Sequence, residues 1–361
     1  GGLALSSNYT LYADMSRRLM AIIGQFSPEQ EIYSIDECFL RFDGCGHWDL
    51  TAQGRALRAG VWRGIGLPVG VGIGATKTLA KLANRLAKRH RDFRAEGVCN
   101  LLDLAPAQQA GYFAELAVED VWGIGGRWGS QLRQLGISTV ADLMRADTRT
   151  LQGRFGVVLA RTIMELNGGS CLPWEETPPP RQQIIASRSF GKPVTTFEML
   201  SEAVASHTAR AAVKLRQEGL RAGLIQVFAG TNPFKAEAPQ YHPGATVPLS
   251  IPTADTTRLL RAARVGLRHL YRQGFEYKRA GVVLLDLAPA GAVTGDLFAA
   301  TKAEMTARRE RLMAIMDAIN HRWGQGTARY LAEGLEQPWR MNRQRMTPRY
   351  TTCWEELPVA I

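Results

Sequence analysis

Cysteine is scarce in this sequence of 361 residues, and its arrangement argues against two kinds of small domain. The five cysteines are odd in number and widely scattered, so a disulfide scaffold is not predicted. No two of them have the spacing of zinc ligands, which argues against a zinc module. Reduced thiols are typical of a cytoplasmic protein. The cysteines are Cys38, Cys45, Cys99, Cys171 and Cys353.

Long apolar runs and acidic residues are also few. The run from Gly281 to Leu285 ends at Asp286 and is too short to span a bilayer, so no membrane association through a span is predicted. Asp and Glu number 33 against 44 Lys and Arg, which leaves a net charge of +11. A basic protein with 45% hydrophobic residues is expected to be globular and to bind a polyanion, nucleic acid first and an anionic membrane surface second.

Hydrophobic periodicity predicts several structural units, and the length fits two to three domains. Helices at 9–23, 51–64 and 76–88 alternate with a strand, tight reversal and strand at 31–42 and with a strand at 68–74, which indicates an α/β layer. Residues 106–169 show only helical patterns. The run Pro178-Pro179-Pro180 cannot continue a helix and predicts a linker. Beyond it, a four-stranded α+β unit and a basic, partly helical tail are expected; its strands lie at 183–190, 223–230, 245–251 and 280–287, and its helices at 196–218 and 255–273.

Two adjacent carboxylates interrupt an apolar strand. Asp36 and Glu37 stand between Tyr33-Ser34-Ile35 and Cys38-Phe39-Leu40. Neighbouring strand residues face opposite ways, so both acids can serve one site only where the backbone turns. Carboxylate oxygens brought together suit Mg²⁺, and two such ions can activate an attacking oxygen and stabilise a leaving phosphate oxygen. The alternative is an acidic hairpin tip in water.

A helix with one basic face follows a glycine-rich strand. Lys77, Lys81, Arg85 and Lys88 fall on one side of the helix predicted at 76–88, and leucines and alanines on the other. Such a row can bind a triphosphate or a nucleic-acid backbone. The alternative is a solvated face of an amphipathic helix. The preceding strand does not match a P-loop, because Ala75-Thr76 stands where Gly-Lys is required.

A glycine hairpin is predicted at Val121-Trp122-Gly123-Ile124-Gly125. Glycines let a backbone approach a ligand and direct its N–H groups at a phosphate without reading a base. The spacing matches the helix-hairpin-helix pattern of DNA-binding proteins, and the alternative is an ordinary helical turn.

With these motifs in this order, the chain resembles the Y-family DNA polymerases, and within them the UmuC subfamily of bacterial DNA polymerase V. The resemblance covers essentially the whole chain. It is carried by Ser6-Ser7-Asn8-Tyr9, Tyr12-Ala13-Asp14-Met15, Tyr33-Ser34-Ile35-Asp36-Glu37, residues 76–84, Val121-Trp122-Gly123-Ile124-Gly125, Ser187-Arg188-Ser189-Phe190-Gly191 and Pro348-Arg349-Tyr350-Thr351-Thr352.

The resemblance implies a multidomain α/β and α+β protein with the right-hand polymerase architecture. Residues 1–105 would form an incomplete palm, 106–172 a helical thumb with the helix-hairpin-helix, 173–183 a linker, and 184–292 a four-stranded little finger. Residues 293–361 would form a basic C-terminal tail.

The same resemblance implies roles for single residues. Asp36 and Glu37 would be catalytic metal ligands for two Mg²⁺ ions, and Lys88, Lys81 and Lys77 would face the incoming nucleotide. Contacts to DNA would come from the glycine hairpin and from a strand of the little finger. These DNA-binding residues are Gly123, Ile124, Gly125, Ser187, Arg188 and Ser189.

The implied activity is error-prone translesion DNA synthesis in the SOS response, by template-directed nucleotidyl transfer on damaged primer–template DNA with dNTP. The implied partners are a processed UmuD-like subunit, the RecA filament and the sliding clamp. A clamp-binding peptide in degenerate form is expected at Thr294-Gly295-Asp296-Leu297-Phe298, where Leu297 and Phe298 keep the apolar anchor.

The beginning of the chain departs from the family pattern. It starts at Gly1, and no strand with a further metal-binding aspartate precedes Asp36. We therefore expect that the first palm strand and most of the fingers are missing, so that this polypeptide is an inactive or weakly active fragment. A non-catalytic module that binds damaged DNA is the alternative function. A helix-hairpin-helix nuclease or glycosylase is disfavoured, because Arg127, Trp128 and Gly129 follow the hairpin where a catalytic lysine and aspartate are expected.

Overall fold

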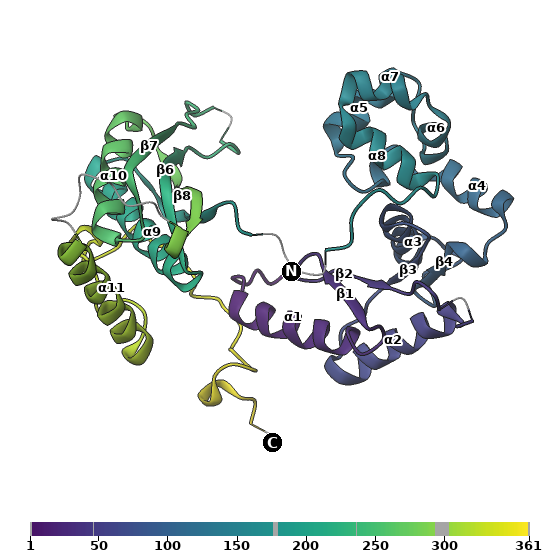
Figure 1. Ribbon diagram of the computed structural model, residues 1–361, viewed down its shortest axis with the longest axis horizontal. Helices are drawn as coiled ribbons and strands as arrows, with labels where there is room; N and C mark the ends of the chain where they lie inside the picture. The colour runs from purple at the N-terminus through teal and green to yellow at the C-terminus, as the bar shows by residue number, and fades with distance from the viewer. Residues whose placement is uncertain (1, 46, 176–179, 236, 293–302, 360–361) are drawn as a thin grey trace. The chain divides into compact units, whose positions relative to one another are not determined.

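The structure is a computed structural model that describes residues 2–45, 47–175, 180–235, 237–292 and 303–359. The chain divides into two compact units (Figure 1). Unit 1 comprises residues 1–178 and 346–361, and unit 2 comprises residues 179–345. In the described residues, no helix is both long enough and apolar enough to cross a membrane.

Unit 1 begins with two packed helices and a hairpin. Asn8 caps α1, and Asp49 caps α2, each by accepting a hydrogen bond from a backbone N–H of the first turn. The antiparallel strands β1 and β2 pair from Glu29 with Arg41 to Ile32 with Cys38. Leu19, Met20, Ile23, Leu57 and Val61 form the core of this part. The elements are α1 (Tyr9–Ile23), β1 (Glu29–Ile32), β2 (Cys38–Arg41) and α2 (Leu50–Ile65).

A parallel strand–helix–strand unit follows, made of β3 (Val71–Ile73), α3 (Lys77–Arg89) and β4 (Val98–Asn100). Glycine is required where β3 crosses α3, because a Cβ atom on Gly72 would lie 2.0 Å from the backbone nitrogen of Asn84. The apolar face of α3 is buried and its basic face is turned away from that core. The sequence analysis did not predict β4, since three buried residues show no alternation.

The helical part of unit 1 is as the sequence predicts, a set of short helices without strands between residues 106 and 169. Its core continues the buried face of α3 and includes Val121, Ile124, Leu132 and Leu159. The elements are η1 (Leu101–Asp103), α4 (Pro106–Glu115), η2 (Val118–Asp120), α5 (Gly126–Gln134), α6 (Val140–Arg145), α7 (Thr148–Phe155) and α8 (Val157–Leu166).

A buried carboxylate ties α8 to the first turn of α3. Glu165 is fully buried and accepts hydrogen bonds from the backbone N–H groups of Thr78, Cys171 and Leu172 at 3.1, 2.7 and 3.1 Å. Its own carbonyl accepts a hydrogen bond from the Thr76 hydroxyl at 2.8 Å. Burial raises the pKa of Glu165, but the three N–H donors outweigh this effect and hold the pKa below its ordinary value.

The C-terminal residues return to unit 1. Met346 forms a parallel bridge with Ser6, and the buried Asn8 side chain donates a hydrogen bond to the Thr347 carbonyl at 3.0 Å. A short turn, η6 (Trp354–Glu356), follows. Residues 303–345 belong to unit 2, and residues 346–359 belong to unit 1. The expected division of the chain into palm, thumb, linker, little finger and tail stays a prediction.

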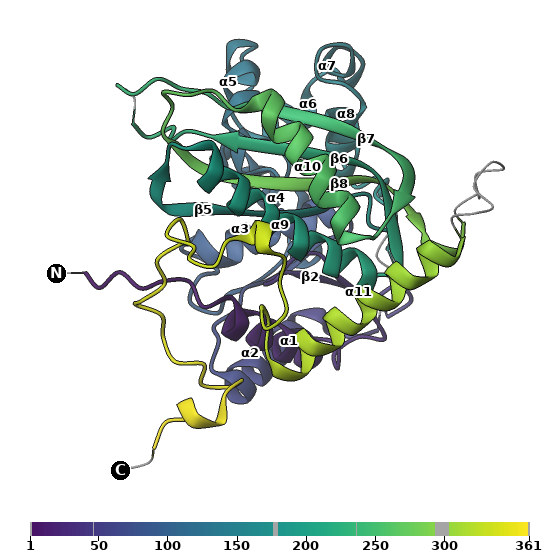
Figure 2. The same cartoon turned by 90° about the vertical axis from the view of Figure 1, so that its left-hand side faces the viewer.

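Unit 2 is built on a four-stranded antiparallel sheet in the order β5-β8-β6-β7, in the described part of the unit (Figures 1 and 2). Alternate residues such as Ile184, Ile225, Val282 and Leu284 face α9 and α10, which cover one side of the sheet. The elements are β5 (Ile184–Val194), α9 (Phe197–Gln217), β6 (Leu220–Gly230), β7 (Gly244–Thr253), α10 (Thr256–Leu270) and β8 (Tyr277–Pro289).

Residues 303–345 pack on this α/β core. Helix α11 (Ala303–Trp323) lies beside α9, where Asp317 forms a two-point ion pair with Arg216 at 2.7 and 2.8 Å (Figure 1). The turn η5 (Leu331–Glu333) follows, and Trp339 enters the core of unit 2 with only 3% of its surface exposed. The backbone N–H of Gly191 on β5 donates to the Trp339 carbonyl at 3.1 Å. This segment is thus an integral layer of unit 2.

Replacing Glu165 with glutamine is expected to destabilise unit 1 by about 3 kcal/mol, because buried N–H donors lose a charged acceptor. A carboxyl with a lowered native pKa stabilises the fold above its unfolded-state pKa of about 4.3, and this contribution is lost as the pH falls through the native pKa. Urea unfolding should therefore show the full difference at pH 7 and a smaller one below pH 4.

The matched control is Glu115→Gln, since the Glu115 side chain is 64% exposed. A Glu165→Gln protein as stable as the control at pH 7 would contradict the anchoring role of Glu165.

Candidate active site

The two predicted carboxylates lie at a five-residue turn between β1 and β2. The backbone N–H groups of Tyr33 and Ser34 both donate to the Glu37 carbonyl at 3.0 Å, which closes the turn. The Ser34 hydroxyl donates to Asp36 Oδ1 at 2.8 Å. Asp36 is exposed and Glu37 is half-buried. The predicted reversal of the backbone is confirmed, and it places both acids at one end of the hairpin.

Glu37 meets the basic face of α3. Its Oε1 atom lies 2.8 Å from Lys81 Nζ. That ammonium also lies 4.7 Å from the ring centroid of Tyr33 and 5.4 Å from that of Trp122, and the Trp122 indole N–H donates to the Tyr33 hydroxyl at 3.1 Å. Cation–π attraction and the ion pair together hold Lys81 beside the acids. The hairpin turn, α3 and the glycine hairpin thus meet at one place within unit 1.

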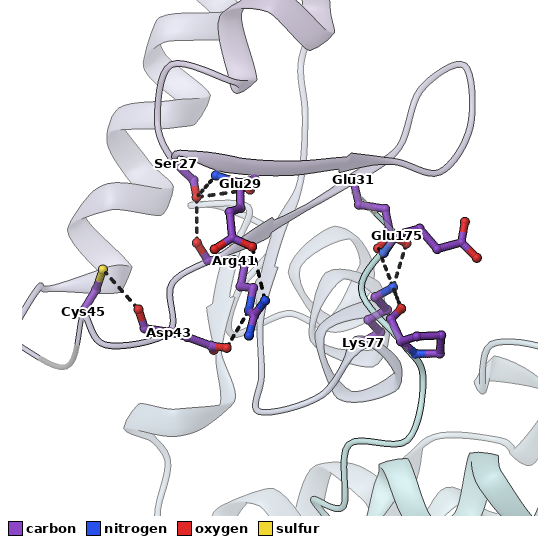
Figure 3. A network of polar contacts seen from close by, with 9 residues as sticks. Ser27, Glu29, Glu31, Arg41, Asp43, Cys45, Lys77 and Glu175 are labelled. Atoms are coloured by element: carbon purple, nitrogen blue, oxygen red, sulfur yellow. Dashed lines mark hydrogen bonds and ion pairs between the residues drawn. The ribbon is translucent and has the colours of Figure 1, made fainter. Parts of the chain in front are cut away.

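Lys77 has a different environment (Figure 3). Its Nζ atom contacts both carboxylate oxygens of Glu31 and donates to the Pro173 carbonyl at 2.7 Å. Glu31 also accepts the backbone N–H of Glu175 at 2.9 Å. Only 13% of the Lys77 side chain and 10% of the Glu31 side chain are exposed. This pair joins β1, α3 and the segment that follows α8, so Lys77 has a structural partner already.

The other two cations of the predicted basic face, Arg85 and Lys88, differ from each other. Arg85 forms a close ion pair with Asp120, at the end of η2 and just before the glycine hairpin. Lys88 is exposed, and no hydrogen bond or ion pair to its side chain is found among the described residues. Its alkyl chain packs beside Gly70, where a Cβ atom would lie 2.9 Å from Lys88 Cγ. Lys88 is therefore free to bind an anionic ligand.

The donor chemistry at the turn fits magnesium. Mg²⁺ is usually held by one or two carboxylates together with substrate phosphates and water, and Asp36 and Glu37 supply two such carboxylates. In the part of the chain that the structure describes, no group of three or more His, Cys, Asp or Glu side chains could hold a metal ion. A magnesium site here would therefore depend on ligands from the substrate.

The glycine hairpin leaves its backbone open to solvent. Gly123 has φ of +89°, a conformation that favours glycine, and Ile124 is buried in the core. Gly125 precedes α5 with φ of −88°, and a Cβ atom added there would meet nothing within 4 Å. The Ile124 side chain anchors the loop, while the backbone around Gly123 and Gly125 is exposed.

The predicted DNA-contact residues of β5 lie in unit 2 and separate by strand alternation. Ser187 and Ser189 pair with Gly281 and Arg279 of β8, and strand alternation directs their side chains to the other side of the sheet from that of Arg188. Ser187 and Arg188 both line a cavity together with residues of α9. The predicted clamp-binding residues Leu297 and Phe298 lie outside the described residues.

Sequence reasoning missed the structural partners of the lysines. The motifs and strand patterns do not predict that a cation of α3 contacts Tyr33, Trp122 and Glu31. The available signal was the position of Tyr33 next to the acids and of Trp122 inside the glycine hairpin. The separation of 89 residues between these two gives no local pattern that would pair them.

Comparison with known proteins identifies the family. Residues 3–85 match the impB/mucB/samB family, residues 181–297 match the C-terminal domain of that family, and residues 310–360 match a domain of unknown function. The chain is 42% identical to Protein UmuC of Salmonella typhimurium over 358 residues, which covers 99% of this chain and 84% of the relative. The chain belongs to the impB/mucB/samB family.

More distant relatives include proteins that are named as DNA polymerases. A DNA polymerase IV of Moorella thermoacetica is 26% identical over 335 residues, covering 90% of this chain and 77% of that protein. The fold is similar to a solved Y-family DNA polymerase chimera, with a TM-score of 0.59, 19% identity and 78% coverage of each chain. Membership of the impB/mucB/samB family therefore confirms the predicted UmuC-like resemblance, and the mixed α/β fold is of the Y-family type.

Replacing Lys77 with alanine is expected to destabilise unit 1 by about 2–3 kcal/mol, because it leaves the buried Glu31 carboxylate without its cation. Urea unfolding followed by tryptophan fluorescence measures this, since Trp174 lies 5.4 Å from Lys77 Nζ. Lys88→Ala is the matched control and should change stability by less than about 0.5 kcal/mol. Equal stability of the two variants would show that Lys77 has no structural role.

Proposed function

We propose that this chain carries out error-prone translesion DNA synthesis, by template-directed nucleotidyl transfer, in the SOS response to DNA damage. The observation that carries the proposal is the ion pair of 2.8 Å between Glu37 and Lys81, which unites the acidic turn and the basic helix in one site. Membership of the impB/mucB/samB family and the Y-family fold support the same DNA-directed DNA polymerase activity.

Asp36 and Glu37 would hold Mg²⁺ together with oxygens of the incoming triphosphate. When bound, these ions would favour attack by the primer oxygen and stabilise the leaving phosphate oxygen. Glu37 is kept in place by Lys81, whose charge offsets part of the repulsion between the two neighbouring carboxylates. Asp36 is held through Ser34 and remains exposed to the substrate.

The three lysines of α3 would then have different roles, according to the partner that each one has. The exposed ammonium of Lys88 is available to bind the triphosphate as a flexible point charge. Lys81 contacts Glu37, so its ammonium is close enough to bind a negatively charged group of the substrate beside the acids. Lys77 would have an indirect role, because its ion pair with Glu31 holds β1 against α3 and leaves its charge neutralised.

The remaining parts would hold primer–template DNA. The exposed backbone at Gly123 and Gly125, anchored by the buried Ile124, supports a phosphate contact of these three residues that does not depend on sequence. On unit 2, Ser187 and Ser189 would face the DNA backbone, and Arg188 would contribute only through its main chain. In this scheme residues 1–105 are the palm, 106–172 the thumb and 184–292 the little finger.

Partners of the family extend the proposal. A processed UmuD-like subunit, the RecA filament and the sliding clamp are proposed to bind this chain, the clamp through Leu297 and Phe298. A pull-down with the clamp should weaken severalfold on Phe298→Ala if this peptide is the contact.

A non-catalytic module that binds damaged DNA is the second candidate. The observation in its favour is the absence, among the described residues, of a third side chain able to complete a metal site with Asp36 and Glu37. Such a module would bind primer–template DNA as tightly as a polymerase but would not extend the primer.

Primer extension with Mg²⁺ tests the catalytic role. We expect the 361-residue polypeptide to incorporate dNTP at least a hundredfold more slowly than a complete two-metal polymerase, because two carboxylates hold the metal weakly. Any residual incorporation should disappear in Asp36→Asn and in Glu37→Gln. Robust incorporation by the pure polypeptide would overturn the expectation of weak activity, and activity that survives Asp36→Asn would overturn the assignment of the site.

Gly125→Ala tests the DNA contact of the glycine hairpin. The added methyl group fits the fold but would stand between the backbone and a phosphate, so affinity for DNA of any sequence should fall threefold to tenfold. Fluorescence anisotropy with a primer–template measures this at fixed salt. Gly111→Ala in α4 is the matched control, since a Cβ atom there also meets nothing within 4 Å. Unchanged affinity of Gly125→Ala would exclude the contact.

A further inference from the structure

Unit 2 contains a cavity of about 560 Å³, and apart from Ser187 and Arg188 its lining has no part in the proposed polymerase function. It lies between α9, the first residues of β5, α11 and residues 325–340. Its lining is strongly basic, with six Lys or Arg against two acidic residues. The cationic residues are Arg188, Arg210, Lys214, Arg216, Arg329 and Arg340, and the acidic residues are Asp317 and Glu333.

Internal ion pairs neutralise only one of these arginines. Asp317 is taken up by Arg216, which also donates to the Ala254 carbonyl at 2.8 Å and so closes one side of the cavity. Within the described residues, Arg188, Arg210, Arg329 and Arg340 have no carboxylate oxygen within 4.0 Å. All four residues are exposed, so water and salt screen part of their mutual repulsion, and the cavity presents an excess of positive charge to solvent.

The second acidic residue of the cavity, Glu333, does not neutralise the four remaining arginines. Glu333 accepts the backbone N–H of Tyr330 at 3.0 Å, and burial raises the pKa of Glu333 against the effect of the surrounding arginines. Burial and the like charges of Arg188 and Arg340 lower the pKa of Arg210. The effect of Arg188 and Arg340 on the pKa of Arg210 agrees with a surplus of positive charge at the cavity.

The walls of the cavity are rigidly built. His207 lines it with 1% of its surface exposed, and its Nε2 atom has no hydrogen-bond partner in the described part of the chain. Trp339 packs against His207 at 6.0 Å between ring centroids and is buried in the core, which fixes residues 325–340 on α9. The exposed arginines therefore project from a backbone that Trp339 and His207 anchor, and the His207 side chain holds an unsatisfied polar atom.

We propose that this cavity binds a small molecule that carries two or more linked phosphates. Arginine pairs well with phosphate because its planar guanidinium donates two parallel hydrogen bonds, and four unpaired guanidiniums match an anion with several negative charges. The volume is that of a small-ligand site and fits a nucleotide. Enclosure by α11 and residues 325–340 favours a compact ligand over a continuous nucleic-acid strand.

The proposal gives a role to a segment of unknown function. Residues 310–360 match a domain for which no function is recorded, and this domain supplies Arg329, Arg340 and one whole wall of the cavity. Ligand binding would bridge this segment to α9 and β5, which come from the C-terminal domain of the family. Phosphate binding would thus stabilise the packing of the two family domains within unit 2.

Isothermal titration of the full chain with inorganic triphosphate, without magnesium, tests the proposal. We expect saturable binding that weakens at least tenfold in Arg210→Ala and in Arg340→Ala. Arg264→Ala on the exposed side of α10 is the matched control and should bind as the unchanged protein does. Lys88→Ala should reduce only the binding that the proposed triphosphate site of unit 1 contributes, and it should leave the binding that is lost in Arg210→Ala.

Two further measurements keep the test independent of folding. In the absence of ligand, Arg210→Ala should melt no lower than the unchanged protein, because it removes one of several repelling charges. ATP in place of inorganic triphosphate shows whether a base and sugar add affinity. Absence of saturable binding, equal binding by Arg210→Ala, or loss of binding only in Lys88→Ala would overturn the proposal. Displacement of triphosphate by a short single-stranded DNA at lower concentration would assign the cavity to nucleic acid instead.

Discussion

Helix α3 carries three cations that are partly withdrawn from water, and each of them meets an acid from a different segment. Lys77 meets Glu31 of β1, Lys81 meets Glu37 of the adjoining turn, and Arg85 meets Asp120 of η2. Since a charge removed from water needs a partner, these pairs bring the acidic turn and the glycine hairpin to the same helix. The candidate active site depends on this constraint more than on any single apolar contact.

The presence or absence of an acidic partner also distinguishes cations that stabilise the fold from cations that are available to a ligand. Lys77 and Glu31 satisfy each other in a nearly buried setting, whereas Lys88 at the other end of α3 has no partner among the described residues. In unit 2, Arg216 is neutralised by Asp317, and its neighbours in the cavity are not. Paired cations therefore hold the fold together, and unpaired cations in a concave place indicate an anionic ligand.

Much of the fold followed from local patterns. The amphipathic period of α3 and the strand pattern of β5 predicted helix and strand correctly, because each pattern reports which side of an element is buried. The short strand β4 was missed, since three buried residues have no period to read. Local patterns also gave no sign that Trp339 and Met346 pack on different units, because these contacts join distant parts of the chain.

The sequence by itself determined the chemistry of the site: two adjacent acids at a turn, a row of cations at helical spacing and a glycine hairpin with an exposed backbone. Motif order was enough to predict the family, because those residue types recur at those spacings. Tertiary structure alone decided which cation faces which acid, that Tyr33 and Trp122 enclose Lys81, and that Arg188 shares a cavity with Arg340. These relations join residues far apart in the chain, and only folding sets the distances on which charge–charge interactions depend.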